Sequence, residues 1–217
     1  SDDFTNIPLL KSYSKTNLPL LVSCGMADIQ EVQETLDTIG SLDGYPTVLL
    51  LTTSEYPTIP ENVNLLKLQT LSEKFPDLIL GYSDHTLGIE IPIAAVSLGA
   101  TVIEKHFTLD KNMDGPDQKL SADVTDFKNL VTRIRQIEQM MGKRRIKPTK
   151  SEKKYRQAMR RSLVFSKDLK KGTILKKNYF KYLRPGNGVP LNNLDLIVGS
   201  KINQNVKKGS FLRRDMI

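Results

Sequence analysis

The sequence predicts an α/β protein: a run of strand–helix units in about residues 1–146, followed by a small β-rich module in residues 160–217. Between Leu18 and Gly142, short apolar runs alternate with amphipathic stretches, as in parallel strands joined by helical crossovers. Beyond Arg161, short strand-like runs are separated by Gly- and Pro-containing turns. A chain of 217 residues is long enough for one large domain, or for one medium and one small domain.

Four apolar runs in the first part are predicted to be strands. They span residues 20–23, 47–52, 78–83 and 101–106. Each run contains successive apolar residues, such as Val102-Ile103 in the last one, which indicates strands buried on both faces beneath helices.

Four helices are expected between and after these strands, at residues 27–42, 62–75, 89–98 and 123–141. In the first, Ile29, Val32, Leu36 and Ile39 recur with helical spacing and form one apolar face. The last is predicted to stop at Gly142, because glycine commonly ends a helix.

Two architectures fit these units, an open doubly wound sheet and a βα-barrel. Polar residues lie at the end of every predicted strand, for example Ser23, Ser83 and His106. Active sites of βα-barrels are built from the carboxyl ends of the strands, so this placement favours the barrel. Four units supply only part of an eight-stranded barrel.

The second part begins with a polar, basic stretch at residues 147–159, which is interpreted as a linker. Three short strands are expected after it, at residues 162–165, 173–175 and 180–183. Turns are predicted at Lys171-Gly172, at residues 185–188 and at Lys208-Gly209.

Composition narrows the functional classes. The net charge of +8 is concentrated in residues 143–171, where only Glu152 and Asp168 are acidic. This stretch is typical of a solvated linker, and attraction of anionic substrates or contact with an acidic partner are the alternatives. No aromatic residues interleave with its cations, which disfavours nucleic-acid binding.

Cys24 is the only cysteine, no apolar run approaches the roughly 20 residues of a membrane span, and no signal peptide is recognised, so a cytoplasmic protein is expected.

The only two histidines, His85 and His106, both lie at the ends of predicted strands. Each could be a structural histidine, but two at neighbouring strand ends could also share one metal ion, for which neutral imidazole is a good ligand. Such a site would leave positions open for water and substrate, as catalytic metal sites do.

Other polar residues would point toward the same place. Glu104 lies two residues before His106, and Ser83 two before His85, so each pair shares a face of its strand. A structural ion pair is the alternative role for Glu104. Ser23, Ser54 and Ser83 end successive strands and could hold a phosphate group. Residues 110–119 are expected to form a loop on this face, either for substrate contact or as ordinary surface.

Several stretches of the chain, in order and at consistent spacing, resemble the signature segments of sialic acid synthases. They are Gly81 to Gly88 (GYSDHTLG), Ala94-Ala95-Val96, Glu104 to Lys111 (EKHFTLDK), Gly115-Pro116-Asp117, Ser151 to Lys154, Arg160 to Leu163 and Arg184 to Gly188 (RPGNG). The resemblance implies the C-terminal part of a TIM (β/α)8 barrel, followed by an antifreeze-like (SAF, β-clip) domain.

The resemblance also implies a reaction: condensation of phosphoenolpyruvate with N-acetylmannosamine or a related amino sugar to a nonulosonic acid, with release of phosphate by C–O cleavage. His85 and His106 would bind Mn²⁺ or Mg²⁺, which would polarise the sugar aldehyde. Glu104 would stabilise the cation or move a proton. The remaining matches are Ser1, Ser23, Ser54 and Ser83 on the phosphoenolpyruvate side, and Tyr56, Asp117 and Arg184 on the sugar side.

In this family the arginine matched by Arg184 reaches the partner subunit's site, which implies a domain-swapped homodimer. Three departures concern the sugar more than the reaction. Gln118 stands where histidine is frequent, Leu51-Thr52 replaces the usual His-Cys, and Ser54 stands where other members have asparagine.

Family members also carry a first half-barrel, which supplies a glutamate and lysines to the site. We therefore expect this chain to be part of a longer one, or to pair with a separate N-terminal chain, and to show no turnover without that half. The alternatives are a non-catalytic remnant that uses the antifreeze-like domain for sugar binding or dimer contact, and another phosphoenolpyruvate-using barrel enzyme. The Arg184 to Gly188 segment argues against the latter.

Overall fold

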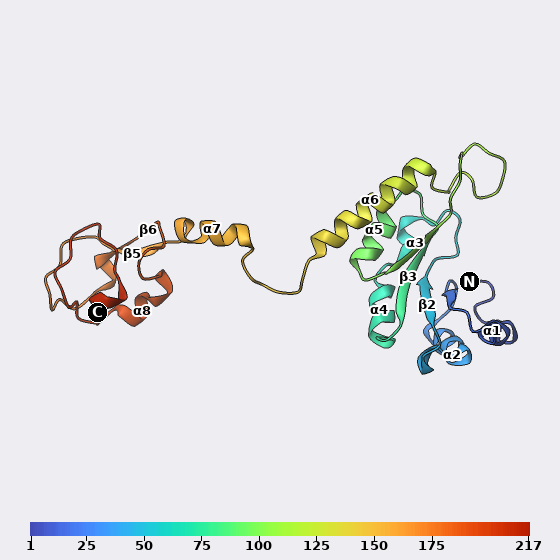
Figure 1. Ribbon diagram of the computed structural model, residues 1–217, viewed down its shortest axis with the longest axis horizontal. Coiled ribbons are helices and arrows are strands. Elements are labelled where there is room, and N and C mark those ends of the chain that lie inside the picture. The colour runs from blue at the N-terminus through green and yellow to red at the C-terminus, as the bar shows by residue number, and fades with distance from the viewer. The chain divides into compact units, whose positions relative to one another are not determined.

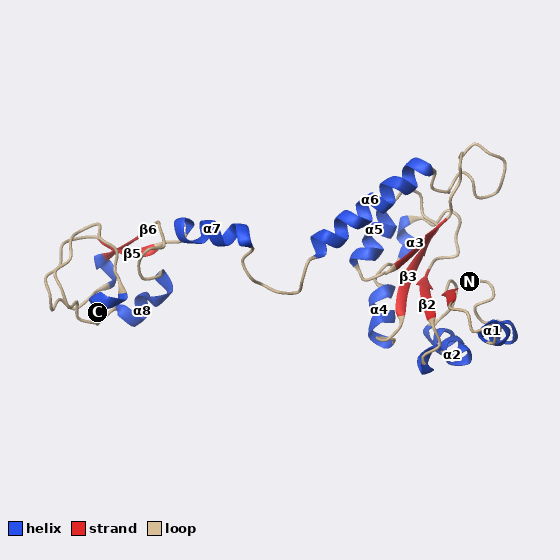
Figure 2. Ribbon diagram, viewed as in Figure 1, coloured by secondary structure: helices blue, strands red, loops and turns tan.

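The computed structural model describes residues 1–217, which divide into two compact units, Ser1–Lys143 and Arg144–Ile217 (Figure 1). The first unit holds a parallel sheet with helices around it. The second holds a small two-stranded sheet in a largely irregular fold (Figure 2).

The sheet of the first unit has four parallel strands in the order β1-β2-β3-β4. Their bounds are β1 Leu20–Ser23, β2 Thr47–Leu51, β3 Ile79–Asp84 and β4 Val102–Lys105. Each strand pairs with its neighbour in sequence, whereas a doubly wound sheet reverses strand order at a switch point. The consecutive order is that of a barrel wall, as predicted from the polar strand ends.

One helix precedes the first strand, and the others follow strands. They are α1 Ile7–Ser14, α2 Ile29–Ile39, α3 Pro60–Val63, α4 Lys67–Lys74, α5 Glu90–Ser97 and α6 Val124–Met141, with a 3₁₀ turn at Ser41–Asp43. Apolar side chains from the strands and helices meet in one core, in which Leu36, Leu49 and Tyr82 are almost completely buried. On the apolar face predicted for α2, Val32, Leu36 and Ile39 are buried, whereas Ile29 at the start of the helix is exposed.

Two predictions for this unit were wrong in detail. The single helix expected at residues 62–75 is two helices, because Asn64 takes a left-handed conformation with φ 51° that an α-helix cannot continue. Helix α1 was not predicted; Asn6 caps it through a hydrogen bond to the Leu9 amide, and only Leu10 is buried along it.

The second unit is built on strands β5 (Ser162–Phe165) and β6 (Phe180–Leu183), which are antiparallel. It also contains α7 Lys150–Met159, α8 Leu194–Ile197 and 3₁₀ turns at Lys177–Tyr179, Leu191–Asn193 and Arg214–Met216. Leu163, Phe165, Leu175 and Leu212 form the centre of its core. The strand expected at residues 173–175 is only a single bridge between Ile174 and Lys201.

The stretch interpreted as a linker, residues 147–159, contains a helix. Thr149 and Glu152 form a reciprocal capping box that starts α7, and strong helix formers follow. No residue of α7 is buried, yet the Gln157 carbonyl accepts a hydrogen bond from the Gly186 amide at 2.6 Å. This helix thus belongs to the second unit and holds the RPGNG loop.

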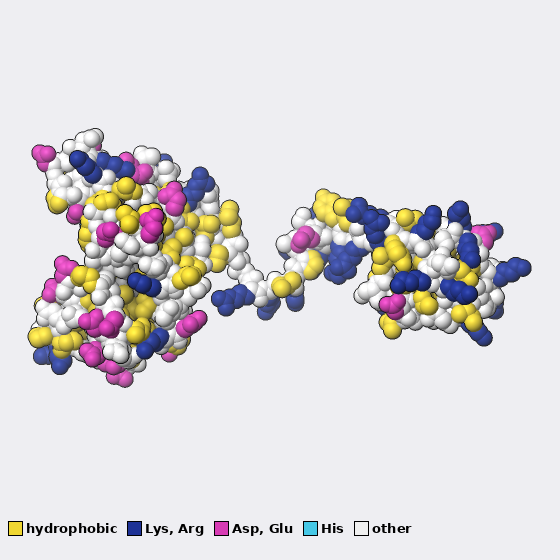
Figure 3. All heavy atoms as spheres, turned by 180° about the vertical axis from the view of Figure 1, so that it is seen from behind, with side chains coloured by type: hydrophobic (Ala, Val, Ile, Leu, Met, Phe, Trp, Pro, Cys, Tyr) yellow, Lys and Arg dark blue, Asp and Glu magenta, His cyan; other side chains and the backbone are white.

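The two units carry opposite charge. The second has twenty-one lysines and arginines against four aspartates and glutamates, whereas the first has eleven against twenty. On the side drawn in Figure 3, basic side chains crowd the second unit, and both signs are mixed on the first. None of the helices is both long and apolar enough to cross a membrane.

Candidate active site

A polar cleft lies at the carboxyl ends of the four parallel strands. Its lining comes from all four strand ends and from the first residues of the chain: Ser1, Asp2, Asp3, Ser23, Tyr56, Ser83, His85, Glu104 and His106. Seven of the predicted site residues are therefore brought together in one place, because the carboxyl ends of parallel strands share an edge.

The two imidazoles face each other across this cleft. Their ring centroids are 5.3 Å apart with the ring planes at 80°, and each ring follows the last residue of its strand. The His85 Nδ1 lies 2.8 Å from the Thr53 carbonyl oxygen, which can only accept, so Nδ1 carries the proton. Nε2 of His85 is then left with a free lone pair, the form in which histidine binds metals.

The second imidazole has a carboxylate neighbour. The Nδ1 of His106 is 3.5 Å from Oδ2 of Asp117, which comes from the loop after β4. A carboxylate at Nδ1 favours the tautomer with Nε2 unprotonated. Both rings can therefore present Nε2 as a ligand atom.

The donor set suits a metal with an open coordination sphere. Burial lowers the pKa of His85, which keeps this imidazole neutral at pH 7. No group of three or more His, Cys, Asp or Glu side chains is arranged so that it could hold a metal ion, so the two imidazoles would be its main protein ligands. The other positions would be left to water and substrate, as in catalytic sites.

Tyr56 covers the pair of histidines. Its ring stacks on His85 at 4.1 Å between centroids and meets His106 edge-on at 5.7 Å. The side chain is still half exposed, so its hydroxyl is free to meet a ligand. Burial, followed by the charges of Asp2 and Asp117, raises the Tyr56 pKa, and the phenol stays protonated.

Glu104 is held by a hydroxyl and not by a basic residue. The Ser83 Oγ donates to Oε1 of Glu104 at 2.7 Å, and the two residues are register partners on β3 and β4. The structural ion pair considered for Glu104 is not formed. Glu104 itself is exposed to the cleft, so its carboxylate is available to a substrate.

Three of the four predicted serines gather around Gly25. The Ser1 ammonium donates to Ser23 Oγ at 2.8 Å, and the two hydroxyls are 3.1 Å apart. A Cβ placed on Gly25 would lie 2.4 Å from Ser54 Oγ and 2.6 Å from Ser1 Oγ. The Ser54 Oγ is buried without a hydrogen-bond partner, so this cluster has an unused donor. The fourth serine, Ser83, is already engaged with Glu104.

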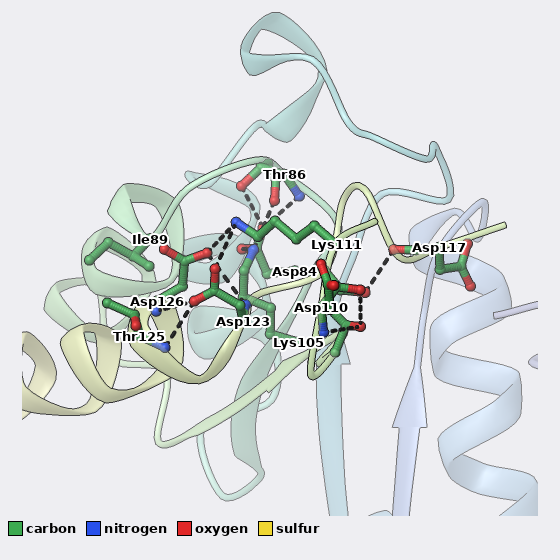
Figure 4. A network of polar contacts seen from close by, with 12 residues as sticks. Asp84, Thr86, Ile89, Lys105, Asp110, Lys111, Asp117, Asp123, Thr125 and Asp126 are labelled. Atoms are coloured by element: carbon green, nitrogen blue, oxygen red, sulfur yellow. Dashed lines mark hydrogen bonds and ion pairs between the residues drawn. The ribbon is translucent and has the colours of Figure 1, made fainter. Parts of the chain in front are cut away.

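The loop after β4 carries Asp117 and is fastened at both ends (Figure 4). Lys111 forms an ion pair with Asp126 at the start of α6, and Gln118 accepts a hydrogen bond from the Thr108 hydroxyl. These contacts bring the loop expected for substrate contact to the side of His106. Arg184 lies in the second unit, exposed just beyond the end of β6.

The sequence interpretation missed two features of this site. One is the Thr53 carbonyl that fixes His85, which no side-chain pattern could reveal. The other is the buried pair of Asp84 and Lys105 behind the histidines, at 2.6 Å. Each is the last residue of its strand and adjacent to a histidine, so strand alternation places both on the face away from the cleft; that signal was present in the sequence.

The sheet is a half-barrel, and its carboxyl edge carries two imidazoles, a carboxylate and clustered hydroxyls. These features place the chain in the class of βα-barrel proteins with a site at the strand ends. The family model that matches residues 1–146 is the NeuB family, and the SAF domain matches residues 160–217. The chain belongs to the NeuB family and carries a C-terminal SAF domain.

Individual proteins agree with this assignment. The N,N'-diacetyllegionaminic acid synthase of Legionella pneumophila is 44% identical over 98% of this chain. The pseudaminic acid synthase of Helicobacter pylori is 35% identical over the whole chain. A crystal structure of N-acetylneuraminic acid synthetase from Leptospira borgpetersenii, with citrate, superposes with a TM-score of 0.66 at 35% identity, covering 72% of this chain and 55% of that one. The chain spans 60% and 64% of the lengths of the two curated relatives.

Proposed function

We propose that this chain forms the C-terminal part of a nonulosonic acid synthase, which condenses phosphoenolpyruvate with an N-acetylated amino sugar. The observation that carries the proposal is the convergence of His85, His106 and Glu104 on one cleft at the strand ends. Sequence similarity to named synthases of this family supports it.

His85 and His106 would hold Mn²⁺ or Mg²⁺ through their Nε2 atoms. When bound, the cation would supply Lewis-acid polarisation of the sugar aldehyde. The protein's own contribution is to hold both imidazoles in place, through the Thr53 carbonyl, Asp117 and the Tyr56 ring.

Glu104 is the acid–base group of the proposed site. Held by Ser83 and open to the cleft, its carboxylate can stabilise the positive charge that develops on the phosphoenolpyruvate carbon, or take the proton of the water that adds there. Phosphate then leaves with C–O cleavage. Tyr56 and Asp117 lie beside the histidines, where the sugar would be bound, and Arg184 would reach it from a partner subunit.

The serine cluster is the proposed phosphate site. Ser1, Ser23 and Ser54 offer hydroxyl donors around Gly25, and the Ser1 nitrogen adds a donor that becomes a backbone amide if the chain continues upstream. A buried donor without a partner is costly unless a ligand or water accepts its hydrogen bond. Bound phosphate oxygens would satisfy Ser54.

Substituting Gly25 should weaken this phosphate site selectively. In Gly25→Ala the added methyl group would lie 2.4 Å from Ser54 Oγ and 2.6 Å from Ser1 Oγ, so both hydroxyls must turn away. Losing two hydrogen bonds of about 1 kcal/mol each predicts a rise of roughly 10- to 30-fold in the KM for phosphoenolpyruvate. Steady-state kinetics measure it, with Ser12→Ala on exposed α1 as the control; an unchanged KM would remove the cluster from the site.

The acceptor we favour is a diacetylated amino sugar. Identity is 44% to the N,N'-diacetyllegionaminic acid synthase and 32% to the N-acetylneuraminate-9-phosphate synthase of Homo sapiens. The test is product analysis by mass spectrometry, using the complete protein that carries this chain, phosphoenolpyruvate, Mn²⁺ and competing acceptors including N-acetylmannosamine. A nonulosonic acid and an equal amount of phosphate are expected. Absence of any such product from all acceptors would contradict the proposed function.

We further propose that the protein acts as a domain-swapped homodimer. The strongly basic second unit and the acidic first unit are electrostatically complementary, so the second unit of one copy is suited to the first unit of another. This arrangement would bring Arg184 to a partner's cleft. Mixing Arg184→Ala protein with His85→Ala protein should restore part of the activity that each has lost, because one mixed dimer site then regains both residues.

A further inference from the structure

Behind the two histidines, on the side of the strands away from the cleft, lies a buried ion pair. The Lys105 Nζ is 2.6 Å from Oδ2 of Asp84, and the side chains are 2% and 0% exposed. The two residues are register partners at the ends of β4 and β3. His106 follows Lys105 directly, and His85 follows Asp84.

The ion pair fixes the residues on both sides of His85, because Asp84 precedes it and the pair forms hydrogen bonds with Thr86 after it. The Lys105 ammonium donates to Asp84 and also to the Thr86 carbonyl at 2.8 Å. The other Asp84 oxygen, Oδ1, accepts from the Thr86 amide at 3.0 Å and from the Thr86 hydroxyl at 2.8 Å. One side chain on β4 therefore holds the residues before and after the β3 histidine (Figure 4).

Stability alone does not explain a pair of this kind. Removing two charges from water costs about as much as their attraction returns, and apolar replacements of buried pairs are often equally stable. A network of hydrogen bonds is directional, however, so it fixes the relative positions of its residues more narrowly than an apolar contact does. Here the geometry fixed is the relative position of the two residues that carry imidazoles.

We infer that Asp84, Lys105 and Thr86 act together as positioning residues that set the spacing of His85 and His106 for one shared cation. The inference deepens the proposed function, because it assigns to residues outside the cleft the task of pre-organising the metal site. Residues that orient metal ligands from behind typically contribute 10- to 100-fold to metal affinity.

The test uses the complete protein and the double variant Asp84→Asn/Lys105→Met, which removes both charges and leaves neither unpaired. We expect a thermal unfolding midpoint near that of the wild type but Mn²⁺ binding, followed by electron paramagnetic resonance, weaker by 10- to 100-fold. In the metal-free protein, nitrogen NMR should show that the His85 Nδ1 proton, bonded to Thr53, loses its protection from exchange. Thr86→Val, which deletes a single hydroxyl, should cause the same changes to a smaller extent. It replaces the double variant in this test if the double variant fails to fold.

The matched control is Arg135→Met/Glu138→Gln, which removes an exposed ion pair on α6 to which the proposed site assigns no role. It should leave Mn²⁺ affinity and the His85 proton unchanged. Wild-type Mn²⁺ affinity together with a protected His85 proton in the folded Asp84/Lys105 variant, or in Thr86→Val, would overturn the inference. If even the wild type fails to bind Mn²⁺, the metal proposal fails, while the NMR result still decides whether the pair positions His85.

Discussion

Glu104→Gln is expected to reduce turnover by roughly 10²- to 10⁴-fold, the usual contribution of a positioned acid–base group. The amide keeps the shape of the side chain and can still accept the Ser83 hydrogen bond, but it carries no charge and cannot take a proton. Because Glu104 is not needed to hold the cation in our account, Mn²⁺ affinity should change little.

Initial-rate kinetics and Mn²⁺ titration of the same preparation distinguish these effects. Glu138→Gln, on the exposed face of α6, is the matched control and should behave as the wild type. Ser83→Ala should lie between the two, because it frees Glu104 without removing its charge. Near-normal turnover by Glu104→Gln would exclude Glu104 from the chemistry.

The 217-residue chain alone is expected to show no synthase turnover. Strands β1 and β4 each pair on one side only, so both edges of the half-barrel are open and the cleft lacks its other wall. Apolar side chains such as Leu21 and Phe107 are more than half exposed, and a completed barrel would be expected to bury them. Supplying the residues that complete the barrel, ahead of Ser1 or as a second chain, should restore activity.

Activity assays and size-exclusion chromatography test this expectation together. The incomplete chain should associate or aggregate through its open edges, and the completed barrel should elute as a defined oligomer. Synthase turnover by the 217-residue chain on its own would contradict the prediction.

Much of this arrangement could be predicted from sequence because it follows from short-range patterns. Apolar runs located the four strands, and polar residues such as Ser83 and His85 marked the ends that form the cleft. What failed depended on single backbone conformations or on tertiary contacts. The left-handed Asn64 splits a helix that side-chain periodicity alone would continue.

The site was harder to derive than the fold. Glu104 and Ser83 are twenty-one residues apart, and only the strand register makes them partners. Roles for Ser1, Tyr56 and Asp117 came from family resemblance alone. The Thr53 carbonyl could not have been found by either route, because every residue has a carbonyl and only the folded loop selects this one.

The most direct measurement is an electron paramagnetic resonance titration of the complete protein with Mn²⁺. We predict one tightly bound ion per chain, with hyperfine couplings to nitrogens of two imidazoles. Tight binding and the two-imidazole couplings should both be lost in His85→Gln and in His106→Gln. Wild-type Mn²⁺ affinity in both variants, or a bound ion without imidazole couplings, would show that these rings, though only 5.3 Å apart, share no cation.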